Sequence, residues 1–104
     1  MTFQKRISEP ELVKPVLKIL DSKSNGFSST SNLIDDLIST FKPSGKDAEI
    51  IEGRNDTFFS QKVRNLISHR KGGTNFIRRG YAVYNKENHG LSITSLGKKF
   101  IKSS

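Results

Sequence analysis

The hydrophobic residues of this chain change their spacing once, and this change restricts the possible folds more than any other feature. Up to about residue 70 they recur every three or four positions, as on one face of a helix. Over "YAVYNKENHGLSI", residues 81–93, they alternate on either side of a polar turn, as in a β-hairpin. The sequence therefore predicts an α+β fold that is mainly α, with a small β-hairpin near its end.

Three amphipathic segments account for the helical part of the chain. Their spacing predicts helices at about residues 10–22, 31–41 and 57–70. We expect Pro15 in the first turns of the first helix, where a missing N–H costs little. One of the residues Ser29 to Ser31 is expected to cap the second helix, and Asp56 or Thr57 to cap the third.

Shorter elements are expected between and after these helices. The stretch "GFSST" is expected to hold one or two extended residues, with Phe27 pointing into the core. Residues 46–52 are expected to form a short helical turn with Ile50 and Ile51 packed inward. A last short helix is expected at residues 96–101.

The order of these elements is that of a winged helix-turn-helix domain. In such a fold the third helix enters the major groove of DNA, and the hairpin lies on the flanking backbone. The length of 104 residues suffices for one domain with one modest core. We therefore expect a single winged-helix domain over residues 1–104, with its core at about 10–101.

Positive charge is concentrated in the second half of the chain. Residues 1–53 carry seven Lys or Arg and eight Asp or Glu, whereas residues 54–104 carry eleven and two. Such an asymmetry is typical of a protein that binds a polyanion. The alternative is a surface that simply has an excess of lysine. We favour nucleic acid, because the excess coincides with the polar face of the third helix.

The two faces of this third helix differ in their chemistry. At about 100° per residue, one face takes the hydrophobic residues Phe59, Val63, Leu66 and Ile67. The opposite face carries hydrogen-bonding groups and no acid: Gln61, Arg64, Asn65, Ser68 and Lys71. Arginine can bond O6 and N7 of guanine as a pair, and Asn or Gln can bond N6 and N7 of adenine. The polar face is therefore predicted to read DNA.

We predict three groups of residues that contact DNA. Base edges are assigned to Ser60, Gln61, Arg64, Asn65 and Ser68. The DNA backbone is assigned to Thr57, Lys62, His69, Arg70, Lys71, Arg78 and Arg79. The turn of the hairpin, the wing, is expected to reach DNA through Lys86, Asn88 and His89. Two alternatives stay open: a structural network around Arg64 and Asn65, such as a bond from Arg64 to the end of the second helix or to Asp56, and a contact of His69 with the last helical carbonyls.

Several other classes of protein are not supported by the sequence. The absence of cysteine excludes disulfides and thiolate metal sites. The two histidines form no HExxH pattern, and "KPSGKD" lacks the spacing of a phosphate-binding P-loop. We therefore expect no catalysis, no cofactor and no metal. The start of the chain has no apolar signal segment, and no apolar run approaches membrane-spanning length, so we expect a cytoplasmic protein.

Four stretches of the sequence resemble a known family. They are "PSGK" (43–46), "RNDTFFSQKVRNLISHR" (54–70), "RRGYAVY" (78–84) and "LSITSLGKKF" (91–100). Together they resemble the N-terminal winged-helix domains of Mrr-type restriction-system proteins, from the first helix to Phe100. The resemblance implies contacts with double-stranded DNA through Gln61, Arg64 and Asn65, and a separate nuclease or other effector domain as partner. The segment "SHRKGGTNFIRR" is longer and more basic than the simplest Mrr-type pattern.

Other functions remain open for a winged helix of this kind. A transcription regulator would normally need a dimerisation helix, for which the short terminal segments leave little room. A protein-docking domain would show an apolar patch on the third helix instead of polar groups. A basic face alone does not distinguish DNA from RNA, although an A-form RNA duplex hides its major groove from a helix.

Overall fold

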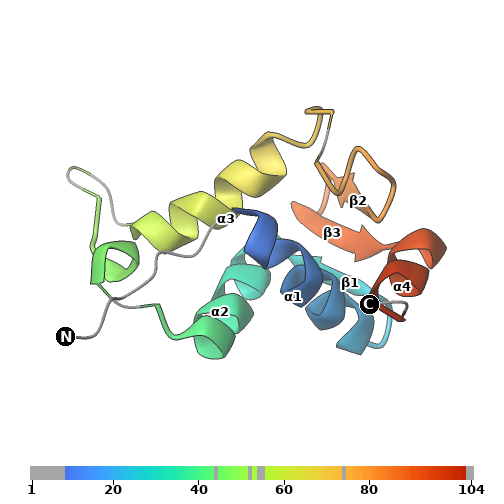
Figure 1. Ribbon diagram of the computed structural model, residues 1–104, viewed down its shortest axis with the longest axis horizontal. Helices are drawn as coiled ribbons and strands as arrows, with labels where there is room; N and C mark the ends of the chain where they lie inside the picture. The colour runs from blue at the N-terminus through green and yellow to red at the C-terminus, as the bar shows by residue number, and fades with distance from the viewer. Residues whose placement is uncertain (1–8, 44, 52, 54–55, 74, 103–104) are drawn as a thin grey trace.

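The fold, taken from a computed structural model, contains helices and one small sheet (Figure 1). The structure describes residues 9–43, 45–51, 53, 56–73 and 75–102. In chain order the elements are α1 (Glu9–Ser22), β1 (Phe27–Ser29), α2 (Thr30–Phe41), the 3-10 helix η1 (Gly45–Ala48), α3 (Phe58–Ser68), β2 (Ala82–Asn85), β3 (Gly90–Ile93) and α4 (Ser95–Lys102). The fold is therefore α+β, as the change in hydrophobic spacing predicts.

The strands form an antiparallel sheet with β3 in the middle, between β1 and β2. The predicted hairpin is confirmed as β2 and β3, and the expected extended piece is its third strand, with Phe27 opposite Ser92. Within β1, Ser28 is the buried residue and Phe27 is only half-buried. The expected core position of Phe27 is therefore wrong by one residue, because successive side chains of a strand point to opposite faces.

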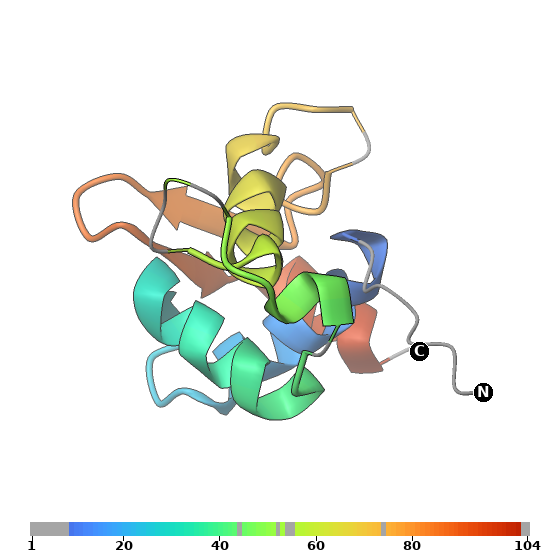
Figure 2. The same ribbon diagram turned by 90° about the vertical axis from the view of Figure 1, so that its left-hand side faces the viewer.

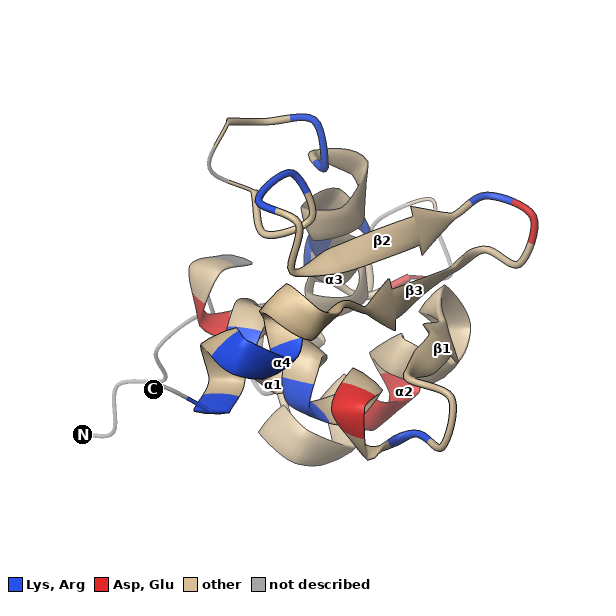
Figure 3. Ribbon diagram, turned by 90° about the vertical axis from the view of Figure 1, so that its right-hand side faces the viewer, with Lys and Arg blue, Asp and Glu red and all other residues tan. Residues whose placement is uncertain are grey.

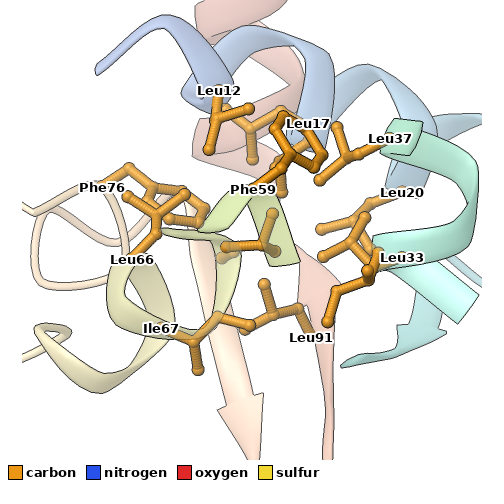
Figure 4. Packing of buried hydrophobic residues seen from close by; sticks show 14 residues of the cluster. Leu12, Leu17, Leu20, Leu33, Leu37, Phe59, Leu66, Ile67, Phe76 and Leu91 are labelled. Carbon is orange, nitrogen blue, oxygen red and sulfur yellow. The ribbon is translucent and has the colours of Figure 1, made fainter. Parts of the chain in front are cut away.

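The helices α1, α2 and α3 and the sheet share one hydrophobic core (Figure 4). The four residues of the predicted hydrophobic face of α3 all lie in it, each at most 6% exposed: Phe59, Val63, Leu66 and Ile67. The Phe59 ring is completely buried, with its centre 5.9 Å from that of Phe41 on α2. This packing fixes which side of α3 faces solvent.

Pro15 lies deeper in the first helix than expected. Because α1 begins at Glu9, Pro15 is its seventh residue and does not belong to the first turn. Proline has no N–H for the helical ladder and weakens a helix interior. Burial offsets this cost, because α1 places four side chains completely in the core: Leu12, Val16, Leu17 and Leu20.

The connector between α2 and α3 differs from the prediction. Its helical part is η1, which ends before the two isoleucines. The backbone of Ile50 forms an isolated antiparallel bridge with Thr57, and the Ile50 side chain is 68% exposed. The expected inward packing of Ile50 is wrong, because the chain is extended there and turns its side chain to solvent, and Ile51 is only half-buried. Asp47 is instead the buried connector residue among those described, at 2% exposure.

The third helix is shorter than predicted at both ends. Thr57 caps its start, where the hydroxyl accepts a hydrogen bond from the backbone N–H three residues on, at 3.0 Å. Near its other end, Nδ2 of Asn75 donates to the carbonyl oxygen of Leu66 at 2.8 Å. Arg70 and Lys71 therefore lie in the turn that follows α3, and not on the helix itself.

Candidate functional site

An open groove of about 420 Å³ lies between the start of α2, the outer face of α3 and the β2–β3 hairpin. In Figure 2 this hairpin projects beyond the helices, next to the start of α2. The groove is lined by Ser29, Thr30, Ser31, Arg64, Ile67, Ser68, Arg70, Tyr84 and His89. None of these lining residues is acidic. The groove thus combines predicted contacts from α3 and the wing with residues of α2.

The first turn of α2 forms one wall of the groove. The hydroxyl of Ser29 accepts the N–H of Asn32 at 3.2 Å, which confirms the expected cap. The N–H of Thr30 donates to the carbonyl oxygen of His89 at 2.8 Å and ties this helix end to the hairpin. A helix start carries partial positive charge, so this wall favours an anion. From the sequence alone, Ser29, Thr30 and Ser31 are interpreted only as possible caps. Three consecutive hydroxyl residues at a helix start are the signal that could have indicated a binding surface.

Arg64 is held by a carboxylate at the start of its own helix. Its Nε donates to Oδ2 of Asp56 at 3.1 Å, with the two side chains 48% and 21% exposed. Asp56 lies eight residues earlier in the chain, just before the Thr57 cap. The Arg64 side chain therefore runs back along α3. The alternative expectation of a bond to Asp56 is confirmed, and the base contact of Arg64 stays a prediction.

Two amides occupy the outer face of α3 one turn apart. Nε2 of Gln61 donates to Oδ1 of Asn65 at 2.8 Å, and both residues are half-buried. Ser68, near the end of the helix, is exposed and lines the groove. The bond between the amides holds both side chains in a defined geometry, so α3 presents an ordered polar face.

Arg70 connects the turn after α3 to the sheet. Its guanidinium carbon lies 4.4 Å from the centre of the Tyr84 ring on β2. Its Nη1 donates to the carbonyl oxygen of Ile67 at 3.2 Å. The aromatic ring and the carbonyl end of a helix both attract a cation. Arg70 is thereby fixed as a positive group on the groove wall.

Two of the predicted contact residues lie away from this exposed face. Ser60 is 6% exposed, and its hydroxyl accepts a hydrogen bond from Oγ1 of Thr57 at 3.0 Å. The Lys62 ammonium lies 2.9 Å from Oδ1 of Asp47, with the two side chains 16% and 3% exposed. The connector covers Lys62 through Asp47, whereas Ser60 is buried on another side of α3. We therefore leave Ser60 and Lys62 out of the proposed contact face, and Thr57 serves first as a cap.

The remaining predicted backbone contacts lie in the segment after α3, and they do not all face the same hollow of the surface. Lys71 and Arg78 are exposed, and Nη1 of Arg78 donates to the carbonyl oxygen of Lys71 at 3.5 Å. His69 and Arg79 are also exposed, but they line a second hollow of about 530 Å³. Its other walls are mainly apolar and come from α1, α4 and residues such as Phe76. The structure therefore brings Arg70, but not His69 or Arg79, into the groove of Arg64.

The turn of the β2–β3 hairpin is held by its own hydrogen bonds. The side-chain oxygen of Asn85 accepts the N–H groups of Glu87 and Asn88 at 3.0 and 3.1 Å. His89 closes the turn with a left-handed φ of 49°. Lys86, Asn88 and His89 are exposed, as the wing assignment requires. Glu87 places one acid beside Lys86 at the tip (Figure 3).

Similarity to known proteins adds nothing to this geometry. Comparisons with protein-family models, with curated proteins and with solved structures found no match. Among the described residues, no group of three or more His, Asp or Glu side chains is placed to hold a metal ion. No helix in the described ranges is long and apolar enough to cross a membrane. The groove and its side chains are therefore the features that point to a function.

Proposed function

We propose that this chain is a module that binds double-stranded DNA, with a winged-helix arrangement. In this proposal α3 enters the major groove and the β2–β3 turn lies on the adjoining backbone. One observation carries it: the start of α2, the outer face of α3 and the hairpin border a single open groove whose lining holds Arg64, Arg70 and His89 and no acid.

The arrangement of the elements supports this orientation. The order α1, β1, α2, α3, β2, β3 with an antiparallel sheet agrees with a winged helix. With 11 residues, α3 is about 16 Å long, and the major groove of B-DNA admits a helix of this kind. An RNA duplex fits less well, because its major groove is deep and narrow.

The side chains support a division of labour between sequence reading and positioning. Gln61, Arg64, Asn65 and Ser68 present donors and acceptors on the face that meets base edges. Phosphates are assigned to the hydroxyls of Thr30 and Ser31, to the cations Arg70 and Lys71, and to the wing residues Lys86, Asn88 and His89. The excess of positive charge in residues 54–104 supplies the general attraction to DNA.

The resemblance to Mrr-type proteins supports a more specific role. We propose that the module serves as the target-recognition part of a restriction or defence system. A nuclease or other effector domain, in the same or another chain, then acts on the DNA. The sequence resemblance is the support for this step, whereas DNA binding rests on the groove.

A selection from random duplexes tests the proposed function. The chain is mixed with a pool of random double-stranded DNA, both unmodified and with modified cytosine or adenine, at two salt concentrations. Enrichment of a sequence or a modified base is the expected result and identifies the target. Salt-sensitive binding without enrichment keeps DNA binding but overturns the role in target recognition. Failure of the folded chain to bind any duplex overturns the proposal and favours docking on a protein.

A further inference from the structure

The bond between Arg64 and Asp56 leaves one edge of the guanidinium available. It uses Nε, at 3.1 Å from Oδ2 of Asp56. In the described part of the chain, no residue accepts a hydrogen bond from the two terminal nitrogen atoms of Arg64, Nη1 and Nη2. These two atoms form the edge that can bond O6 and N7 of guanine at the same time.

We propose that Asp56 is a positioning residue that makes Arg64 selective for guanine. This inference rests on the proposed function and adds a target base and a residue that controls its choice. Asp56 holds the guanidinium plane in one orientation before DNA arrives, so that the fork of Nη1 and Nη2 faces the DNA. An arginine without this support adopts many rotamers and can contact other bases or phosphates.

The surroundings of Asp56 explain how its carboxylate is held in place. Its backbone carbonyl accepts the N–H of Ile51 at 2.8 Å, and the N–H of Phe58 donates to the carbonyl of Glu49 at 3.0 Å. Together with the bridge between Ile50 and Thr57, these bonds attach the connector to the start of α3. In helix-turn-helix proteins the residues near the start of this helix reach base edges. Asp56 therefore anchors Arg64 where a base contact is expected.

Asp56 has two simpler possible roles, a contribution to folding stability and a contribution to general DNA affinity. Its negative charge and the exposure of its partner argue against both. An ion pair whose arginine is 48% exposed contributes little to stability, so folding does not require it. A carboxylate beside DNA also repels phosphates and lowers affinity for every sequence. An acid at this position therefore weakens general binding, and the role we propose for it is better discrimination between bases.

The experiment uses the duplex enriched by the full chain and a series in which one guanine at a time is replaced by 7-deazaguanine, which lacks the N7 acceptor. We expect one position at which this replacement weakens binding about tenfold, and no such position in Arg64→Ala. In Asp56→Asn we expect the penalty to fall to about threefold or less, while binding to unrelated duplexes stays equal or becomes tighter.

Two further variants make the result specific. Asp21→Asn removes the same charge from the exposed side of α1 and should leave the 7-deazaguanine penalty unchanged. Arg64→Lys lacks the planar guanidinium that Asp56 is proposed to orient, so adding Asp56→Asn to it should change discrimination no further. Circular dichroism confirms that each variant is folded.

The outcomes distinguish this inference from the proposed function. A full penalty retained in Asp56→Asn overturns the inference and leaves DNA binding intact. A wild-type chain that binds duplexes without any sensitive guanine also overturns it. Loss of all binding in a folded Asp56→Asn overturns it as well, because Asp56 would then be needed for more than orientation. A wild-type chain that binds no duplex overturns the proposed function itself.

Discussion

At the scale of single residues, two ion pairs from α3 to the connector have different roles. Lys62 pairs with the buried Asp47, and Arg64 pairs with the more exposed Asp56. The first pair lies where water is excluded, so losing one partner leaves a charge that water hydrates poorly. The second lies on the proposed DNA face. Lys62 is thus expected to serve stability, whereas the role we propose for Arg64 is recognition.

Asp47→Ala tests the structural pair. We expect the free energy of unfolding to fall by about 2 kcal/mol, because the bond of the mostly buried Lys62 ammonium to Oδ1 of Asp47 is lost. Urea denaturation measures this change. Asp35→Ala removes an exposed carboxylate from α2 and should change the free energy by less than about 0.5 kcal/mol. Equal effects of the two substitutions would contradict a stabilising role of the buried pair.

Gly97→Ala tests a close approach of the α4 backbone to the backbone of Tyr81. Alanine normally favours a helix over glycine by up to about 1 kcal/mol. At Gly97, however, a Cβ atom would overlap the carbonyl oxygen of Tyr81 and press on Ile93. We expect a net loss of about 1–3 kcal/mol in thermal or urea unfolding. Gly73→Ala, where a Cβ atom meets nothing, is the control, and an unchanged stability of Gly97→Ala would show that α4 can shift without cost.

At the scale of elements, α3 is the part whose placement matters most for the proposed function. Its hydrophobic face is fixed by Phe59 in the core, its start by the Thr57 cap and its end by Asn75. The β2–β3 hairpin, which borders the same groove, is attached to the start of α2 by the hydrogen bond from the N–H of Thr30 to the carbonyl oxygen of His89. Because each element is held by contacts of its own, the width of the groove is set by the fold.

Arg64→Ala and Lys71→Ala separate reading from positioning on this element. We expect Arg64→Ala to lower affinity for the preferred duplex by roughly 1–3 kcal/mol and to relax sequence preference, because a base contact is lost. Lys71→Ala should weaken all duplexes alike and reduce the salt slope by about one unit. Fluorescence anisotropy on preferred and unrelated duplexes measures both.

Lys18→Ala is the control for these two variants. Lys18 is an exposed cation on α1, and it does not line the groove. The affinity of this variant should stay close to that of the unchanged chain. Equal losses for Arg64→Ala and Lys71→Ala on every duplex would exclude base reading by Arg64.

At the scale of the whole molecule, charge determines how binding depends on salt. The net charge of +8 arises from the second half of the chain, which also supplies α3, the following turn and the wing. With roughly four phosphates contacted, the logarithm of affinity should fall with the logarithm of salt at a slope between about −3 and −4. Titrations at several salt concentrations measure it. A slope near zero would mean that the basic surface does not face DNA.

Local features of the fold could be predicted from the sequence alone. The ranges of α1, α2 and α3 lie within two residues of the expected ones, because hydrophobic spacing records which face of a helix is buried. The caps could be predicted to within one or two residues, since a cap bonds a backbone N–H only three residues away: Ser29 is one of three expected candidates and Thr57 one of two. Two predictions of burial that failed, at Phe27 and Ile50, lie in extended segments, where successive side chains point to opposite faces.

The α+β composition, the polar face of α3 and the position of positive charge follow from the amino-acid sequence alone, because each depends on neighbours in the chain. Which partners those side chains meet depends on the tertiary structure. The bonds of Lys62 to Asp47 and of Arg64 to Asp56 span fifteen and eight residues, and the groove joins α2 to a hairpin more than fifty residues later. No periodic pattern encodes such pairings, because they follow from how the connector and the sheet pack against the shared core.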